Sequence, residues 1–364
     1  MITPSIDETL AHRDHIGPGA GYSSIMRRGT GVIVAVALVI AGCASPSTAA
    51  PPSDNLLPAH WHVFRHIPAV VDIAGPRQDG QFTLALAGRL SLLGPGGLLD
   101  FARGRDGYAT NRGTEPYIAL APDTPIGAGR CSFVPNDVYA LESGSAPAVM
   151  RIDGAGHATR FAGLPTGSFP NGIAFDTAGA FGHRLLVTIA VRGATSVLSI
   201  DCQGAVQTLT RRAPRVEGGI VVAPPSFGNF AGELIAPDEN GGTIYAVDAR
   251  GGTRAIAKSG LPHGGDIGVE SEGFVPAGFS RRSTAYLADR SVPGNAHPGT
   301  DSILELPGVE LVRAGVQPGD LLVATEGGAE TVAVRCRQTC LVRHIAAGPA
   351  ATHAEGHIAF GAVP

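Results

Sequence analysis

The stretch of sequence that determines the fold is NGIAFDTAGAFGHRLLVTIAVRGATSVLSIDCQGAVQTL, residues 171–209. It holds four short apolar runs, bounded by glycine and other turn residues, at 172–175, 184–188, 196–201 and 205–209. Short runs rich in valine, isoleucine and leucine between turn residues are typical of β-strands. The stretch therefore predicts four consecutive strands joined by tight turns.

The same order of short strands recurs further along the chain. The next unit has runs at 219–222, 233–236, 243–248 and 253–256. An aspartate closes the third run of successive units at Asp153, Asp201 and Asp248, which are 48 and 47 residues apart. Four strands in every 40–50 residues is the period of a propeller blade, roughly 40–45 residues in the best-known repeats.

The rest of the chain fits this period less regularly. We expect a further unit of four strands at 273–275, 285–288, 302–306 and 310–312. Three more strands follow at 320–324, 331–335 and 341–345, without a first strand. Nearer the N-terminus, we expect a longer unit from 107 to 163 with an insertion at 124–147, and three strands within 82–102. The run 356–360 matches a first strand with nothing after it. Pairing strands from the two termini closes a propeller and removes its exposed sheet edges. We therefore predict an all-β, six-bladed β-propeller of four-stranded antiparallel blades over residues 59–364, closed by pairing of its N- and C-terminal strands.

Composition agrees with a large folded β-rich body. Hydrophobic residues make up 44% of the chain and charged residues 16%, which suffices for a core and argues against disorder. The 51 glycines and 28 prolines are spread between short apolar runs, as in a chain with many turns. A formal net charge of −4 gives no basic surface for nucleic acid, so we expect no nucleic-acid partner.

The N-terminus predicts an exported lipoprotein. Met26-Arg27-Arg28 precedes the apolar run 32–40, and Ala41-Gly42-Cys43 follows it, which is the pattern of a secretory signal at 26–42. The run is shorter than the roughly 20 apolar residues that a transmembrane helix requires. Ile40-Ala41-Gly42-Cys43 resembles the lipobox of bacterial lipoproteins, which implies cleavage before Cys43 and acylation of its thiol. A buried helix that ends in a chance cysteine is the alternative.

The segments around this signal complete the predicted organisation. Residues 1–25 are polar, and we interpret them as an extension in front of Met26, the true initiator. Residues 43–58 supply the lipidated cysteine and a flexible, proline-rich tether. The expected location is the cell membrane, with the propeller lipid-anchored on its extracytoplasmic side.

Four cysteines remain besides Cys43. An even number in an exported protein favours disulfides. Cys336 and Cys340 flank the meeting point of two apolar runs, where a hairpin would bring them together, and Cys131 would then pair with Cys202. A zinc site at the C-x₃-C spacing is the alternative, but no second close pair of cysteines supports it.

An acid or amide followed by glycine precedes several predicted first strands. The five residues are Asp106, Asn171, Glu217, Glu272 and Glu355. First strands line the channel of a propeller, so these side chains are expected to ring one mouth, where the loops after the second strands add Asp238-Glu239-Asn240, Asp289-Arg290 and Glu326. Carboxylate and amide oxygens suit Ca²⁺. We predict a calcium site there, with acids that merely cap strands or remain solvated as the alternative.

Two histidine patterns also point to this region. His353, Glu355 and His357 would share one face of a strand and could hold a transition metal. His263 and His357 are the candidate general bases for catalysis. The chain has no G-x-S-x-G, H-E-x-x-H or P-loop motif.

A family resemblance rests on two short segments. Pro170-Asn171-Gly172-Ile173-Ala174-Phe175-Asp176 and the following Leu185-Leu186-Val187-Thr188 resemble blade starts in six-bladed gluconolactonase, strictosidine-synthase-like, paraoxonase and NHL-repeat proteins. The resemblance implies a propeller in which a calcium ion, held by Glu, Asn and Asp side chains, polarises an ester, lactone or phosphoester. We therefore expect a calcium-dependent lactonase or esterase, with a non-catalytic propeller that binds a sugar, peptide or cell-envelope partner as the alternative.

Overall fold

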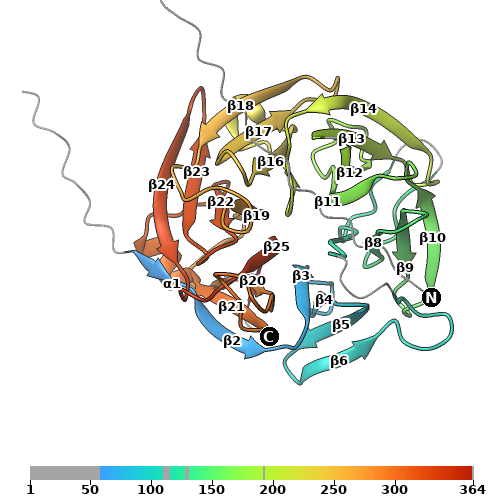
Figure 1. Cartoon of the computed structure of the whole chain (residues 1–364), viewed down its shortest axis with the longest axis horizontal. Coiled ribbons are helices and arrows are strands. Elements are labelled where there is room, and N and C mark those ends of the chain that lie inside the picture. Colours follow the sequence, from blue (N-terminus) through green and yellow to red (C-terminus); the bar gives the residue numbers. More distant parts are fainter. Residues whose placement is uncertain (1–57, 110–114, 128–130, 192, 363–364) are drawn as a thin grey trace, which may run out of the picture. The chain divides into compact units, whose positions relative to one another are not determined.

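The computed structural model describes residues 58–109, 115–127, 131–191 and 193–362. The predicted signal, Cys43 and nearly all of the tether lie outside the described residues. The strands form four separate four-stranded sheets and one nine-stranded sheet. Figure 1 shows these sheets arranged radially about a common axis, with β3, β11, β19 and β25 on the inner side.

Each of the four separate sheets is a simple antiparallel meander. In chain order they are β3 (Val70–Ala74), β4 (Phe82–Leu86), β5 (Arg89–Gly94) and β6 (Gly97–Phe101); β7 (Ile118–Leu120), β8 (Val138–Glu142), β9 (Ala148–Ile152) and β10 (Ala158–Gly163); β11 (Phe169–Phe175), β12 (Leu185–Val191), β13 (Ala194–Ile200) and β14 (Val206–Ala213); and β15 (Val221–Val222), β16 (Leu234–Asp238), β17 (Thr243–Val247) and β18 (Thr253–Lys258). A 3₁₀ turn, η1 (Gly228–Phe230), lies between β15 and β16.

The nine-stranded sheet joins two antiparallel sets of four strands. One set is β19 (Val269–Phe274), β22 (Leu321–Thr325), β23 (Thr331–Cys336) and β24 (Cys340–Ala347), with the short β1 (Ala59–His60) parallel to β24; the other is β25 (Ala354–Ala362), β20 (Ser283–Asp289), β21 (Ser302–Pro307) and β2 (His62–His66). The two sets meet at one parallel pair, Glu272 with His357. The chain is a β-propeller of four-stranded antiparallel blades.

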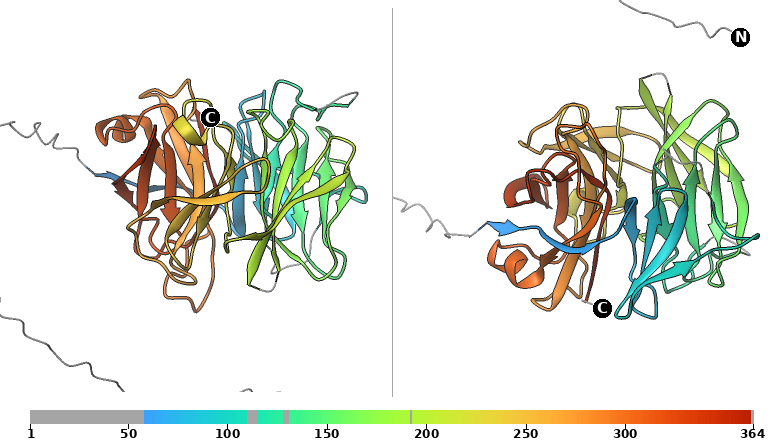
Figure 2. Two further views of the ribbon diagram at one scale, coloured as in Figure 1. Left: turned by 90° about the horizontal axis from the view of Figure 1, so that it is seen from above. Right: turned by 60° about the horizontal axis from the view of Figure 1, so that its bottom comes forward.

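Both chain termini contribute to the same set of strands. The C-terminal β25 pairs with β20, and the N-terminal β2 pairs with β21 on the other side. Figure 2 shows the blue N-terminal segment lying along the orange and red strands of the C-terminal part. The N- and C-terminal strands thus belong to the same set of four strands, but β20 and β21 lie between them, so the expected direct pairing of the two is not formed.

Three predictions of strand order are wrong, and each has a physical reason. The run 273–275 does not start the blade that contains 285–288, because its strand, β19, pairs with β22. β19 is instead the first strand that was missing from the predicted strands at 320–345. Residues 310–312 are helical, within α1 (Gly308–Arg313), where Leu311 is buried and Glu310 and Val312 are partly exposed. Asp106-Gly107-Tyr108 begins no strand; the first strand of that sheet is β7, and part of the expected insertion is β8.

The hydrophobic core lies between neighbouring blades. Between the second and third sheets, the ring of Phe133 packs edge-on against Tyr139 and Phe175, with centroids 5.4 and 4.9 Å apart. Such edge-to-face pairs stabilise a core by about 0.5–1.5 kcal/mol beyond the area they bury. These contacts fix the positions of the inner strands.

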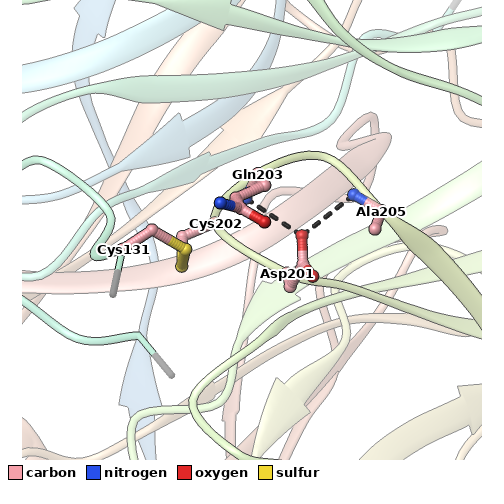
Figure 3. Close-up of a disulfide and its surroundings, with 5 residues drawn as sticks. All are labelled: Cys131, Asp201, Cys202, Gln203 and Ala205. Carbon is pink, nitrogen blue, oxygen red and sulfur yellow. Dashed lines mark hydrogen bonds between the residues drawn. A yellow bond between two sulfur atoms is a disulfide. The ribbon is translucent and has the colours of Figure 1, made fainter. Parts of the chain in front are cut away.

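Both predicted disulfides are confirmed. Cys131 pairs with Cys202, across 71 residues of sequence, and Cys336 pairs with Cys340. Figure 3 shows the first of these next to the turn after β13, where Asp201 accepts hydrogen bonds from the backbone N–H groups of Gln203 and Ala205. The disulfide therefore ties the loop between β7 and β8 to the third sheet. Among the described residues, no helix has the length and apolar character needed to cross a membrane.

Candidate functional site

The inner strands approach so closely that they close the middle of the channel. Gly218 donates its N–H to Asn171 O, and Gly219 donates to Glu270 O, both at 2.9 Å. A Cβ atom added at Gly219 would lie 2.2 Å from Gly356 O, so only glycine fits there. At this position, glycine in the acid-glycine pattern is required because backbone atoms of different blades are in contact.

Asp72 and His357 complete this closure. Asp72 on β3 accepts hydrogen bonds from the backbone N–H groups of His357 and Ile118, both at 2.8 Å, and its Oδ2 lies 3.0 Å from His357 Nδ1. On the other side of the ring, His357 Nε2 lies 3.1 Å from Ile173 O and 3.2 Å from Ile220 O. We call this group the central clasp. Burial alone would lower the pKa of His357, but Asp72 and the two carbonyl groups raise it.

Acidic side chains gather at the end of the channel where the inner strands start. Glu115 and Tyr117 precede β7, Glu217 precedes β15, and Glu270 and Glu355 lie near the starts of β19 and β25. The residues that directly follow three second strands, β16, β20 and β22, come to the same end: Glu239, Arg290 and Glu326. Together with His353, these residues form what we call the acidic mouth.

A continuous polar network joins the mouth across the axis. Arg290 Nη1 lies 2.6 Å from Glu115 Oε1 and 2.8 Å from Glu355 Oε1. The hydroxyl of Tyr117 lies 2.8 Å from Glu270 Oε1 and 2.7 Å from Glu355 Oε2. A hydroxyl donates only one proton, so one of these two carboxyl groups must supply its own.

The electrostatics of the mouth identify Glu270 as the protonated partner. Burial, and then Glu355 and Glu326, raise the pKa of Glu270 well above its ordinary value. The pKa of Glu355 is lowered instead: burial alone would raise it, but His353, Arg290 and Tyr117 outweigh that effect. Tyr117 therefore donates to ionised Glu355 and accepts from neutral Glu270.

Two more glutamates have pKa values shifted toward neutrality. Burial and the charge of Glu239 raise the pKa of Glu217 to about 7, although Arg215 opposes the shift. Burial and Glu355 raise the pKa of Glu326 to about 7 against the effect of His353. Six glutamates thus share one mouth with two basic side chains, Arg290 and His353, and carboxyl groups in such a cluster favour either shared protons or a bound cation.

Two groups of side chains in the mouth have the spacing of metal ligands. They are Glu326 with His353 and Glu355, and Glu239 with Asp266 and Glu326, and the ligand atoms within each group lie within 4.8 Å of one another. In the first group, Glu326 Oε1 lies 2.6 Å from His353 Nε2, and the two carboxylates raise the pKa of that histidine to about 10 despite its burial. A metal there must displace a tightly held proton.

The second group suits a hard cation. All of its donors are carboxylate oxygens, which Ca²⁺ and Mg²⁺ prefer. Glu239 Oε1 also accepts the Asp266 N–H at 2.5 Å, which orients the carboxylate. Glu326 Oε2 is buried and has no hydrogen-bond partner among the described residues, so one oxygen of the shared ligand is available. The residues present fit an oxygen-coordinated ion.

The structure brings together some of the residues predicted from sequence and separates others. Glu217 and Glu355 both lie in the acidic mouth. Asn171 donates its side-chain N–H to Val216 O at 2.9 Å, and its buried amide oxygen has no hydrogen-bond partner in the part of the chain that the structure describes. Glu272 is fully buried beside the Val221 N–H, and burial raises its pKa well above the ordinary value. Asp106 is exposed in the loop after β6, and its carbonyl oxygen accepts the N–H of Ala158 on the outer strand β10, away from the axis.

The candidate histidines do not converge on the mouth as one set. His353 lies in it beside Glu326 and Glu355. His357 belongs to the central clasp, because Gly356 has a φ of +70° that interrupts the regular alternation of β25. His263 is exposed in the loop after β18, with Nδ1 3.2 Å from Asn240 O. The expected metal set of His353, Glu355 and His357 is therefore not formed.

Sequence reasoning missed four residues of the mouth: Glu115, Tyr117, Glu270 and the candidate ligand Asp266. Glu270 was overlooked although the strand period of two places it on the same face as Glu272. Glu115 and Tyr117 were overlooked because the first strand of their blade was placed at residue 107. The sequence Glu115-Pro116-Tyr117 carries no glycine, so the acid-glycine pattern does not identify it. Its Tyr117 nevertheless reaches across the channel to Glu270 and Glu355.

Comparison with known proteins adds similarity of architecture. No model of a protein family matches the chain, and no curated protein sequence matches it. Among solved structures, a virginiamycin B lyase from Staphylococcus aureus is 13% identical, with a TM-score of 0.44 over 76% of this chain and 70% of that one. A gluconolactonase from Xanthomonas campestris is 14% identical, with a TM-score of 0.40 over 64% and 69%. An auxiliary nutrient binding protein from Bacteroides ovatus is 10% identical, with a TM-score of 0.44 over 77% of this chain and 57% of that one.

Proposed function

We propose that the chain is a membrane-anchored, extracytoplasmic propeller whose acidic mouth binds a divalent cation, Ca²⁺ first, and hydrolyses a small lactone or ester there. We count six blades, because the two four-stranded sets of the nine-stranded sheet share only the pair Glu272–His357. The observation that carries the proposal is the convergence of Glu239, Asp266 and Glu326, with an unpartnered oxygen on Glu326.

The supporting chemistry is a hard cation beside a carboxyl group that titrates near neutrality. A bound calcium ion would polarise the carbonyl oxygen of an ester and lower the pKa of a coordinated water. Glu217 belongs to neither ligand group, and its side chain is 20% exposed in the mouth. With a pKa of about 7 it is suited to accept a proton from an attacking water, in place of His263 and His357. Arg290 fixes Glu115 and Glu355 in place and reduces their mutual repulsion.

Hydrolysis assays with a set of γ- and δ-lactones, aryl esters and phosphotriesters test the catalytic part of the proposal. We expect turnover of at least one class that stops with EDTA and returns with Ca²⁺. Glu217→Gln should lower kcat by ~10²-fold or more, the usual contribution of a general base, without changing the amount of calcium bound. Glu142→Gln, a partly buried carboxyl at the end of β8, is the matched control and should retain activity.

The alternative is a propeller that binds a sugar, peptide or other cell-envelope ligand without catalysis. It is favoured by the engagement of His357 in the central clasp, which leaves the mouth without the second predicted histidine base. A calcium-loaded protein that turns over none of the substrate classes, yet binds Ca²⁺ at the mouth, would support this alternative against the hydrolase.

The anchor is tested separately. Cys43→Ala should prevent acylation and release the protein from the membrane fraction into the aqueous fraction, because the tether that follows is polar and proline-rich. Retention of Cys43→Ala in the membrane fraction would contradict the predicted lipid anchor.

A further inference from the structure

The other end of the channel holds a cavity that the proposed function does not use. It has a volume of about 430 Å³ and is lined by residues at the ends of the inner strands and just beyond them. Small-molecule sites commonly have volumes of roughly 300–1,000 Å³. The central clasp and the glycine contacts lie between this cavity and the acidic mouth, because they involve residues in the middle of the same strands.

The cavity wall repeats a short apolar pair around the axis. Four inner strands, or the residues next to them, contribute isoleucine followed by alanine: Ile73-Ala74, Ile118-Ala119, Ile173-Ala174 and Ile358-Ala359. The fully buried isoleucines pack the strands together, and the alanines, each 7–8% exposed, are too small to fill the space. Repetition of a small residue at one level of the ring leaves a defined apolar cup.

One polar side chain lies at the floor of this cup. His357 lines the cavity, and among the residues that the structure describes its Nε2 is within hydrogen-bond distance only of the carbonyl oxygens of Ile173 and Ile220. Carbonyl oxygens only accept, so Nε2 carries a proton and is a donor. The other nitrogen, Nδ1, lies 3.0 Å from Oδ2 of the fully buried Asp72, which holds the ring in place.

We propose that this cavity, the apolar cup, is a second binding site for a small, neutral, largely apolar molecule. Apolar walls favour an uncharged body, and burying an ionised group among them would be costly without a partner. The Nε2 proton at the floor is already shared by two backbone carbonyl groups, so the floor offers no free donor to an anionic group. The volume of about 430 Å³ fits a small molecule.

The naphthalene ketone prodan is a suitable probe, because it is neutral and largely apolar, and its emission shifts to shorter wavelength in apolar surroundings. With the full-length protein we expect a saturable shift with one site per chain. Decan-2-one should compete for the site, and sodium decanoate should compete at least ~10-fold more weakly, a difference of about 1.4 kcal/mol. A shift that does not saturate, or equal competition by decanoate, would overturn the proposal.

Two substitutions locate the site. Ala119→Leu should fill part of the cup, and Thr177→Trp, at an exposed position on its rim, should obstruct it without repacking the core. Each should weaken prodan binding by ~10-fold or more. Thr159→Trp on the outer strand β10 is the matched control and should bind as the unmodified protein does. Unchanged binding by Thr177→Trp would place the probe elsewhere, even if Ala119→Leu failed to fold.

A last variant separates this proposal from the metal site. Glu326→Gln and EDTA should leave prodan binding unchanged, because Glu326 lies at the acidic mouth, beyond the central clasp. Loss of prodan binding with either treatment would assign the probe to the acidic mouth and refute a separate apolar site.

Discussion

The two ends of the channel differ in chemistry although the same inner strands build both. At one end, six glutamates surround Tyr117, Arg290 and His353; the pKa values of five of them are raised, and only that of Glu355 is lowered. At the other end, repeated Ile-Ala pairs line a cavity with His357 at its floor. Position along an inner strand therefore determines whether a residue contributes charge or apolar surface.

The central clasp separates these two environments. Asp72 accepts hydrogen bonds on one side of this layer, His357 Nε2 lies close to two carbonyl oxygens on the other, and the glycines let backbone atoms meet directly. Without this layer, water and ions would pass between the acidic mouth and the apolar cup. The following predictions disturb the layer first and then each end in turn.

The largest expected effect comes from Asp72→Asn. The amide can replace only one of the two carboxylate oxygens, so at least one of the buried donors at Ile118 and His357 loses its acceptor. Breaking a buried pair of this kind costs about 3–5 kcal/mol. Urea unfolding should show this loss. Asp153→Asn, in an exposed turn with comparable backbone hydrogen bonds, is the control and should cost about 1 kcal/mol. Equal losses for the two variants would refute the role of the clasp.

A smaller effect is expected from the disulfide near the apolar cup. Cys131→Ser with Cys202→Ser opens a loop of 71 residues and should lower the free energy of unfolding by about 2–4 kcal/mol. The pair Cys336→Ser with Cys340→Ser, whose cysteines are four residues apart, should lower it less. Because the loop tied by Cys131 contains Pro122 and Asp123 at the rim of the cup, the first variant should also weaken prodan binding and leave calcium binding intact. A greater loss of stability from the second pair would contradict this account.

The smallest effect belongs to a single carboxyl group at the acidic mouth. Glu217 has a pKa of about 7 in the folded protein, above its ordinary value of 4.5. Its neutral form is therefore favoured by folding, so the free energy of unfolding is highest below pH about 4.5 and falls as the pH rises through 7. Glu217→Gln should remove this fall, which amounts to at most ~3 kcal/mol by pH 8, measured in metal-free buffer. An unchanged pH profile would show that Glu217 is not constrained in this way.

Much of the architecture was predictable because strand periodicity and turn residues are local signals. The meanders of residues 169–213 and 221–258 follow directly from alternating apolar runs and glycine turns. The exchange of partners between β19 and β20 was not predictable, since either strand has the pattern of a blade strand and only three-dimensional packing selects the pairing. The mouth was partly predictable: Glu217 and Glu355 were found from the acid-glycine pattern, and Glu239, Arg290 and Glu326 from their positions after second strands. Tyr117 and Glu115 were not found, because they precede a three-residue strand that has no distinctive pattern of its own.

The central claim is that the acidic mouth binds a divalent cation through Glu239, Asp266 and Glu326, and calorimetric titration of the metal-free protein with Ca²⁺ tests it most directly. The account predicts one bound ion per chain, affinity that falls as the pH is lowered below 7 because Glu326 takes up a proton, and a loss of at least ~100-fold in Glu326→Gln but not in Glu142→Gln. No heat of binding with Ca²⁺, Mg²⁺, Mn²⁺ or Zn²⁺, or equal affinity in Glu326→Gln, would contradict it.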